Sequence, residues 1–267
     1  MKRNNLSSRT KTHSGTFIDE LEMSDTILDF AGTVRNMLQE YSILPEHAFN
    51  MDQTAVFFDS SPRKTINEKG SKSICIRSSS GVNGRVTVNL AVSFSGIKLV
   101  PLVIFKGVKG GRVANEWKNF NSGYCSRCVY SAQEKAWCDQ QMMDIWISKC
   151  YAQHLKSIDQ EPFRNLLLLD NFSVHKTNAT HTTLAEFGTM VQMLPPNFTS
   201  KLQILDVGVN KPFKDRLTAI WMQWMVDNDK DTKITRAIIS HWIADAWEAI
   251  PTSAIINTAR RIGFTLE

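Results

Sequence analysis

The stretch NLLLLD at residues 165–170 decides the fold class. Four consecutive leucines without polar alternation predict a short β-strand that is covered on both faces. A helix is expected just before it, capped by Asp139, because apolar residues then recur at helical spacing on one stripe: Met143, Trp146, Ile147, Cys150, Tyr151 and Leu155. A helix that leads into a buried strand predicts an α/β protein with a central sheet and a crossover helix.

Further strands are expected on either side of this run. AFNMDQTAVFFD at residues 48–59 is rich in β-forming residues. RVTVNLAVSF at residues 85–94 alternates strictly, and the Ser95-Gly96 turn after it predicts a hairpin with a second strand at 98–106. Pro101 would place that second strand at a sheet edge or a bulge. Residues 190–194 are expected to add one more strand.

Helices are expected at both ends of the chain. Residues 17–37 combine spaced apolar positions with acidic ones, which predicts one or two amphipathic helices. The last third is predicted to be helical from Asp206 onward, and its tryptophans recur at helical spacing, as core residues do. Residues 107–130 are rich in Gly, Asn and Lys and are expected to form a long loop.

Composition excludes several classes of protein. Of 267 residues, 42% are hydrophobic and 21% are charged, which is too apolar for a disordered chain and ordinary for a folded one. No apolar run is long enough to cross a membrane, and no secretory signal is expected. Five cysteines without an export signal favour a reducing compartment. Cys125 and Cys128 form a CxxC pair, but without a second closely spaced pair ordinary thiols are favoured over a zinc site.

Basic charge is concentrated in one segment. Residues 60–118 contain eleven Lys or Arg against two Glu, a local net charge of +9 in a chain whose total is +5. This distribution predicts a surface that faces a polyanion, and a solvated hairpin face is the alternative.

Three aspartates each stand beside an apolar element: Asp52 within the first strand, Asp170 after the leucine run, and Asp206 at a helix start. A helix cap or a turn explains any one of them. In an α/β sheet, however, strand ends converge on the crevice that binds ligands. Three converging carboxylates without His or Cys would suit two Mg²⁺ or Mn²⁺ ions, which assist phosphodiester cleavage.

The same residues carry a family resemblance. The stretches NMDQT (50–54), LLLLDNFSVH (166–175) and LPPNFTSKLQILDVGVNKPFKDRL (194–217) resemble the catalytic motifs of the pogo, Tigger and jerky-like transposases of the mariner superfamily. The resemblance implies a ribonuclease H-like mixed central sheet flanked by helices, with a helical C-terminal extension. It also implies that Asp52, Asp170 and Asp206 are the catalytic metal ligands. Ile204 stands where the family usually has proline.

Five other residues in these motifs are candidates for contacts with nucleic acid or for supporting the acids: Asn171, His175, Asn197, Gln203 and Lys211. For His175, contact with the scissile phosphate competes with a role that caps a helix or supports a ligand. For Asn197 and Gln203, contact with nucleic acid competes with satisfying the loop backbone.

The resemblance also implies a domain organisation. Residues 1–15 would be the remnant of an N-terminal helix-turn-helix module of the centromere protein B type with its linker, and residues 16–267 the DDE-type catalytic domain. DNA is the expected partner, the resemblance implies a homodimer acting on paired transposon ends, and the nucleus is the expected location.

Three functions follow. The first is a transposon-derived, metal-dependent DNA endonuclease and strand transferase. The second is a catalytically silent, transposase-derived protein that binds DNA or regulates. A small-molecule phosphohydrolase has little support, because the chain has no Gly-rich phosphate cradle.

Overall fold

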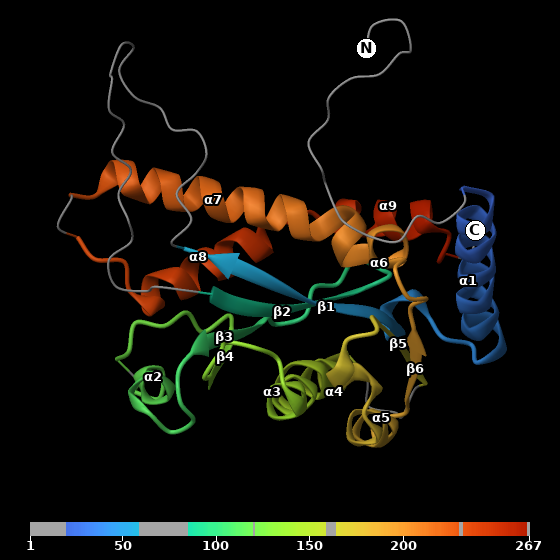
Figure 1. Cartoon of the computed structure of the whole chain (residues 1–267), viewed down its shortest axis with the longest axis horizontal. Coiled ribbons are helices and arrows are strands. Elements are labelled where there is room, and N and C mark those ends of the chain that lie inside the picture. The colour runs from blue at the N-terminus through green and yellow to red at the C-terminus, as the bar shows by residue number, and fades with distance from the viewer. Residues whose placement is uncertain (1–19, 59–84, 120, 159–163, 230–231, 266–267) are drawn as a thin grey trace, which may run out of the picture.

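The computed structural model describes residues 20–58, 85–119, 121–158, 164–229 and 232–265. A six-stranded mixed sheet lies between two layers of helices (Figure 1). Its strand order is β4-β3-β2-β1-β5-β6, with bounds β1 Ala48–Phe57, β2 Arg85–Ser93, β3 Leu102–Lys106, β4 Val129–Gln133, β5 Asn165–Leu169 and β6 Thr189–Met193. The expected α/β class is confirmed.

Each layer of helices seals one apolar core against the sheet. One face is covered by α1 (Glu20–Glu40), α7 (Asn210–Asp227), α8 (Arg236–Glu248) and α9 (Thr252–Ile262), together with the short helix α6 (Thr199–Leu202). The other face is covered by α3 (Gln140–Trp146), the π-helical turn η3 (Ile147–Tyr151), α4 (Ala152–Ile158) and α5 (Asn178–Ala185). Short 3₁₀ turns η2 (Pro45–His47) and η4 (Ser173–Lys176) lead into β1 and follow β5.

The register of β1 and β5 brings two of the predicted acids to the same level of the sheet, at the carboxyl end of β5. These strands are parallel neighbours, and Asn50 is paired with Leu168. Asp52 and Asp170 each stand two residues beyond that paired position. The buried strand predicted from the leucine run is confirmed, since all five residues of β5 are buried.

Strand β2 is buried on both faces. Its alternating residues Val86, Val88, Leu90 and Val92 lie in the core beneath α7, α8 and α9, as the pattern predicts. The polar residues between them are buried as well, because Thr87 donates to the carbonyl of Ala136 and Asn89 to the thiol of Cys138. An alternating strand can therefore be buried on both faces when its polar side chains find hydrogen-bond partners inside the protein.

The segment 107–130 differs from the expected long loop. It contains a short helix, α2 (Arg112–Glu116), and ends at β4, a strand that the sequence analysis missed. Because β4 pairs with β3 and forms the sheet edge, Pro101 does not mark an edge strand. The bulge alternative is confirmed, because the pairs Asn89–Leu102 and Val92–Lys98 enclose two residues on β2 and three on the facing segment. Pro101 instead lies just before β3, where its carbonyl accepts from the backbone N–H of Val129 at 3.0 Å.

The four described cysteines are buried free thiols: Cys125, Cys128, Cys138 and Cys150. Burial raises the pKa of Cys128, Cys138 and Cys150 to about 12, so these three stay protonated near neutral pH. Within the described ranges, none of the helices is long and apolar enough to cross a membrane.

Candidate active site

Asp52 lies in the middle of β1 with its carboxylate beneath α7. Its Oδ2 accepts a hydrogen bond from Nδ2 of Asn210 at 2.6 Å, and only 8% of the residue is exposed. Burial, followed by the negative charge of Asp206, raises the pKa of this carboxyl group to about 7, although the Asn210 and Gln53 donors act in the opposite direction. The site therefore holds an acid that is only partly ionised at neutral pH.

Asp206 lies in η5 (Leu205–Val209), a π-helical turn that runs directly into α7. Its Oδ1 accepts from the same Nδ2 of Asn210, at 3.0 Å. Wide turns of this kind occur frequently at functional sites. Here the turn is pressed against α9, because a Cβ on Gly208 would lie 2.1 Å from Oγ1 of Thr258. Only glycine allows this close approach, which sets the position of Asp206 over β1.

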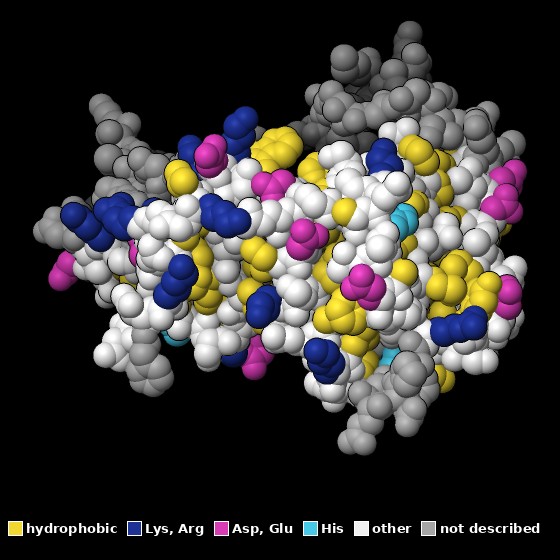
Figure 2. Space-filling view, turned by 90° about the horizontal axis from the view of Figure 1, so that it is seen from below, with side chains coloured by type: hydrophobic (Ala, Val, Ile, Leu, Met, Phe, Trp, Pro, Cys, Tyr) yellow, Lys and Arg dark blue, Asp and Glu magenta, His cyan; other side chains and the backbone are white. Residues whose placement is uncertain are grey.

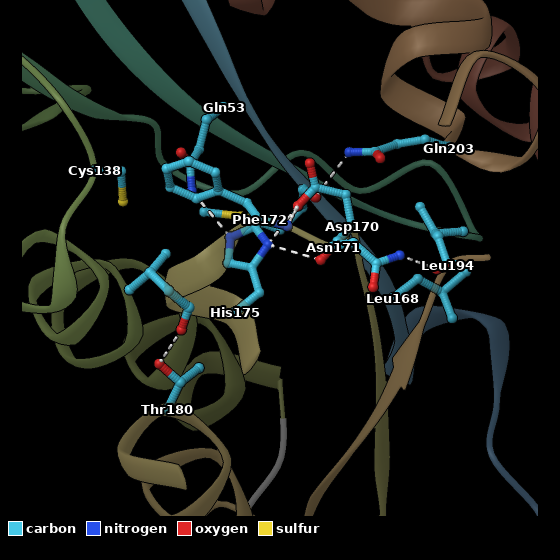
Figure 3. Close-up of polar contacts among 12 residues, drawn as sticks. Gln53, Cys138, Leu168, Asp170, Asn171, Phe172, His175, Thr180, Leu194 and Gln203 are labelled. Atoms are coloured by element: carbon cyan, nitrogen blue, oxygen red, sulfur yellow. Dashed lines mark hydrogen bonds and ion pairs between the residues drawn. The ribbon is translucent and has the colours of Figure 1, made fainter. Parts of the chain in front are cut away.

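Asp170 follows the last residue of β5 and is turned toward His175 (Figure 3). Its Oδ1 accepts from Nδ1 of His175 at 2.6 Å and from the backbone N–H of Phe172 at 3.1 Å. Burial would raise the pKa of this carboxyl group, but the hydrogen bond and charge of His175, with the Phe172 N–H and Lys176, lower it below its ordinary value. Asp170 is thus held in its ionised form.

His175 is buried and uses both ring nitrogens inside the protein. Nε2 lies 2.9 Å from Nε2 of Gln53, and Nδ1 contacts Asp170, so the ring lies between the two (Figure 3). When the Gln53 amide donates, Nε2 accepts and the proton resides on Nδ1, facing the carboxylate. The ring is 1% exposed and supports Asp170, which is the alternative role that the sequence left open for His175, and its contact with the scissile phosphate stays a prediction.

Gln53 and Asn210 are the two polar residues that the sequence analysis missed. Gln53 follows Asp52 directly, and strand alternation sends its side chain to the opposite face, toward His175. Asn210 lies four residues after Asp206, the spacing at which two side chains share a helix face. That spacing was the available signal for Asn210.

The remaining predicted residues are dispersed. Gln203 is fully buried and donates to the carbonyl of Met51 at 3.2 Å, which ties the loop to β1 as its backbone alternative expects, while its contact with nucleic acid stays a prediction. Asn171 donates to the carbonyl of Leu194. Asn197 is exposed, with a φ of 70° that asparagine tolerates. Lys211 is exposed on α7 and pairs with Asp215.

The structure therefore brings Asp52 and Asp206 together and leaves Asp170 turned toward His175. The charge of Asp170 still raises the pKa of Asp52, as a smaller effect than that of Asp206. In the described part of the chain, no three His, Cys, Asp or Glu side chains are arranged to hold a metal ion. The carboxylates of Asp52 and Asp206 nevertheless fit a hard divalent cation. They lie close enough to repel each other, and Asp206 is exposed to solvent, from which an ion could enter.

The basic segment is only partly described. Arg63, Lys64, Lys69, Lys72 and Arg77 lie outside the described residues. Lys and Arg side chains are prominent on the face shown in Figure 2. Around α2, Lys106, Lys109, Arg112 and Lys118 are exposed. Lys98 has a different role. Its Nζ donates to the carbonyls of Trp247, Glu248 and Ile250 and so caps the end of α8.

Curated relatives are longer than this chain. The mouse pogo transposable element with KRAB domain is 24% identical over 270 residues, covering 98% of this chain and 42% of that protein. The human jerky protein homolog is 23% identical, covering 87% of this chain and 40% of that protein. The chain thus spans less than half the length of these relatives.

Solved structures of the Mos1 transposase share the fold. The Mos1 strand transfer complex matches with a TM-score of 0.55 at 10% identity, covering 98% of this chain and 64% of that one. The Mos1 transposase catalytic domain with Raltegravir and Mn matches with a TM-score of 0.52 at 10% identity, covering 93% and 92%. These matches confirm the ribonuclease H-like fold class.

A family model described as DDE superfamily endonuclease matches residues 83–258, more than half of the chain. That range includes Asp170, Asp206 and Asn210. The chain belongs to the DDE superfamily endonuclease family.

Proposed function

We propose that this chain is the catalytic domain of a pogo-like transposase, which cleaves phosphodiester bonds in DNA and transfers the strand with the help of divalent metal ions. The observation that carries the proposal is the pairing of Asp52 with Asp206 at the carboxyl end of β5, where Asp170 also lies. Folding alone does not reward two carboxylates placed side by side, so their arrangement supports a site for a cation.

The roles follow from the contacts. Asp52 and Asp206 are proposed to hold one Mg²⁺ or Mn²⁺ ion, and Asp170 with Asp52 a second. When bound, these ions would supply the Lewis acidity that activates a water molecule or a 3′-hydroxyl and stabilises the leaving oxygen. His175 would orient Asp170 and keep it ionised, and Gln203 would hold the loop before η5 against β1. Matched structures are described as Mos1 complexes with Mg or with Mn, which supports the choice of metal.

The wider organisation is part of the same proposal. Residues 16–267 would form the catalytic domain. DNA would be the partner, approached through the exposed basic residues around α2. One matched Mos1 structure is described as a paired end complex, which supports a homodimer acting on two ends. Chromosomal DNA as substrate would place the protein in the nucleus.

A silent, DNA-binding relative of transposases is the second candidate. The observation in its favour is that Asp170 is turned toward His175 while Asn210 occupies the space between the other two acids. Such a protein would retain the fold and the basic surface without turnover. It would bind DNA with a steep dependence on salt and would cleave none.

Nicking of supercoiled plasmid in Mn²⁺ and in Mg²⁺ separates the two candidates. We expect wild type to nick, and Asp52→Asn, Asp170→Asn and Asp206→Asn each to lose the activity. Asp215→Asn, which removes an exposed carboxylate from α7, is the matched control and should nick like wild type. Equal nicking by wild type and Asp170→Asn would refute the proposed catalysis. Salt-dependent DNA binding without nicking would favour the second candidate.

A further inference from the structure

One amide nitrogen joins the two closest acids of the site. Nδ2 of Asn210 lies 2.6 Å from Oδ2 of Asp52 and 3.0 Å from Oδ1 of Asp206. An amide group carries two N–H donors, and here each carboxylate accepts from the same nitrogen. The donated hydrogens offset the repulsion between the two carboxylates, which is the effect that a cation would have at that position.

The other end of the same amide has no partner. Oδ1 of Asn210 is buried and accepts no hydrogen bond from the described residues, and the whole residue is 8% exposed. A buried carbonyl oxygen without a donor is unfavourable, so native structures rarely retain one without a reason. The nitrogen of the same amide is the atom that faces Asp52 and Asp206, so the oxygen would reach the acidic site if the amide turned over.

Asp52 and Asp206 alone supply fewer oxygen ligands than a divalent cation needs. The described residues contain no group of three His, Cys, Asp or Glu able to hold a metal, and Asp170 is tied to His175. Hard cations such as Mg²⁺ and Mn²⁺ accept amide carbonyl oxygens alongside carboxylates and water. A half-turn of the Asn210 amide about its Cβ–Cγ bond exchanges the positions of nitrogen and oxygen. The oxygen would then face the two carboxylates.

We propose that Asn210 is a further ligand of the divalent cation, with its amide nitrogen joining Asp52 to Asp206 when the cation is absent and its carbonyl oxygen binding the cation when it is present. The inference rests on the proposed function in that the cation is the one used in cleavage. The amide holds the two acids together before the metal arrives, so the site is prepared without an ion. The exchange restores a partner to Oδ1 on binding.

Titration calorimetry with MnCl₂ alone, on the whole chain, tests the inference. Asn210→Leu keeps the size of the side chain but removes both amide atoms, and we expect its Mn²⁺ affinity to fall at least tenfold. Asn210→Asp keeps an oxygen and loses the donor. It should melt at a lower temperature than wild type without metal and show a larger rise with saturating Mn²⁺. Gln223→Leu removes an exposed amide from the same helix and should match wild type.

A second measurement follows the amide of Asn210 in wild type. The ¹³Cγ resonance of Asn210 in wild type, assigned by its loss in Asn210→Asp, should shift on addition of Mg²⁺, because coordination polarises the carbonyl group. An unshifted resonance at saturating Mg²⁺ overturns the inference. So does Mn²⁺ binding by Asn210→Leu that equals or exceeds wild type, since the amide would then only compete with the cation.

The inference and the proposed function fail differently. If wild type binds no Mn²⁺ in calorimetry, the inference is overturned, whereas plasmid nicking still decides whether DNA is cleaved. If Mn²⁺ binds and requires Asn210 but no nicking occurs, the ligand assignment stands and the catalytic proposal does not.

Discussion

The amide nitrogen of Gln53 lies 2.9 Å from Nε2 of His175, on the side of the ring opposite Asp170. Because successive residues of a strand point to opposite faces, β1 presents Asp52 to the α7 side of the sheet and Gln53 to the α3 side. One strand therefore positions two acids, Asp52 directly and Asp170 through Gln53 and His175.

Gln53→Met should weaken the site without removing an acid. The thioether donates no hydrogen bond, so His175 loses the partner that keeps its proton on Nδ1, and Asp170 loses a fixed donor. Changes to groups that orient a ligand typically lower activity or metal affinity about 10- to 100-fold. Plasmid nicking measures the rate, and the ring ¹⁵N shifts of His175 report the tautomer.

Gln192→Met is the control for this change. Gln192 lies on β6 and donates only to the neighbouring Met193 carbonyl, so its replacement should leave nicking at the wild-type rate. An unchanged tautomer and an unchanged rate in Gln53→Met would show that the contact does not orient Asp170.

The pKa of Asp52 is raised and that of Asp170 is lowered, so the two carboxyl groups change the stability of the fold in opposite directions and over different ranges of pH. The pKa of Asp52 is raised to about 7 from an unfolded value near 4, so its ionisation opposes folding as pH rises from about 4 to about 7. The pKa of Asp170 is lowered, so it stabilises the fold above its unfolded value, and that contribution is lost only as pH falls through its folded value. In the absence of metal, stability should therefore decline from about pH 4 to 7.

Asp52→Asn should remove that decline. Without metal at pH 8, we expect the free energy of unfolding of this variant to exceed that of wild type by on the order of a few kcal/mol, so that it melts at a higher temperature, and the two melting temperatures to converge near pH 4. Thermal melts across the pH range provide the measurement, with Asp215→Asn as the control for loss of one negative charge. A constant difference between wild type and Asp52→Asn from pH 4 to 8 would contradict the prediction.

Gly208→Ala should destabilise the fold by about 1–3 kcal/mol through overpacking of η5 against α9. The added Cβ would meet Oγ1 of Thr258 at 2.1 Å and its Cβ at 3.0 Å, and rotation of the hydroxyl relieves only the first contact. Gly32→Ala is the matched control, because the nearest atom to its Cβ would be 4.0 Å away at this half-buried position of α1. There alanine should be neutral or stabilising by about 0.5–1 kcal/mol. Urea unfolding of both variants compares them.

Local sequence patterns account for most of the fold. The leucine run predicted β5, and helical spacing predicted α7, α8 and α9, because burial imposes a period on apolar residues. Strand β4 was not predicted from the sequence, because VYSAQ at 129–133 lies at the edge of the sheet, where only part of a strand's surface needs to be apolar. Its place is set by aromatic packing of Tyr130 on Phe105, a contact between distant residues that no local period records.

The acids of the candidate site stand out in the sequence, whereas for its amides the sequence offers only the four-residue spacing of Asn210 from Asp206. Aspartates beside apolar runs stand out in a sequence, because burial of a carboxylate demands an explanation. Gln53 and Asn210 are ordinary surface residues by type. Their roles depend on which partner each amide faces, and that is decided by the pairing of β1 with β5 and by the π-helical turn before α7. Both features arise from tertiary packing.

Lys98 is a basic residue whose charge is used inside the protein. It contributes to the +9 segment, yet its Nζ donates to three carbonyls at the end of α8, at 2.6 to 3.1 Å. Lys98→Met should therefore lower stability by roughly 1–2 kcal/mol, with allowance for its partial exposure. It should leave the slope of log affinity for DNA against log salt unchanged.

Arg112→Met is the comparison for Lys98→Met, because Arg112 is exposed at the start of α2. If this end of the molecule meets the phosphate backbone, removing one cation should reduce the salt slope by about 0.9 with little loss of stability. Fluorescence anisotropy on duplex DNA at several salt concentrations, paired with urea unfolding, separates the two effects. A reduced slope in Lys98→Met would mean that Lys98 leaves α8 to bind DNA, and then capping would not be its role in the complex.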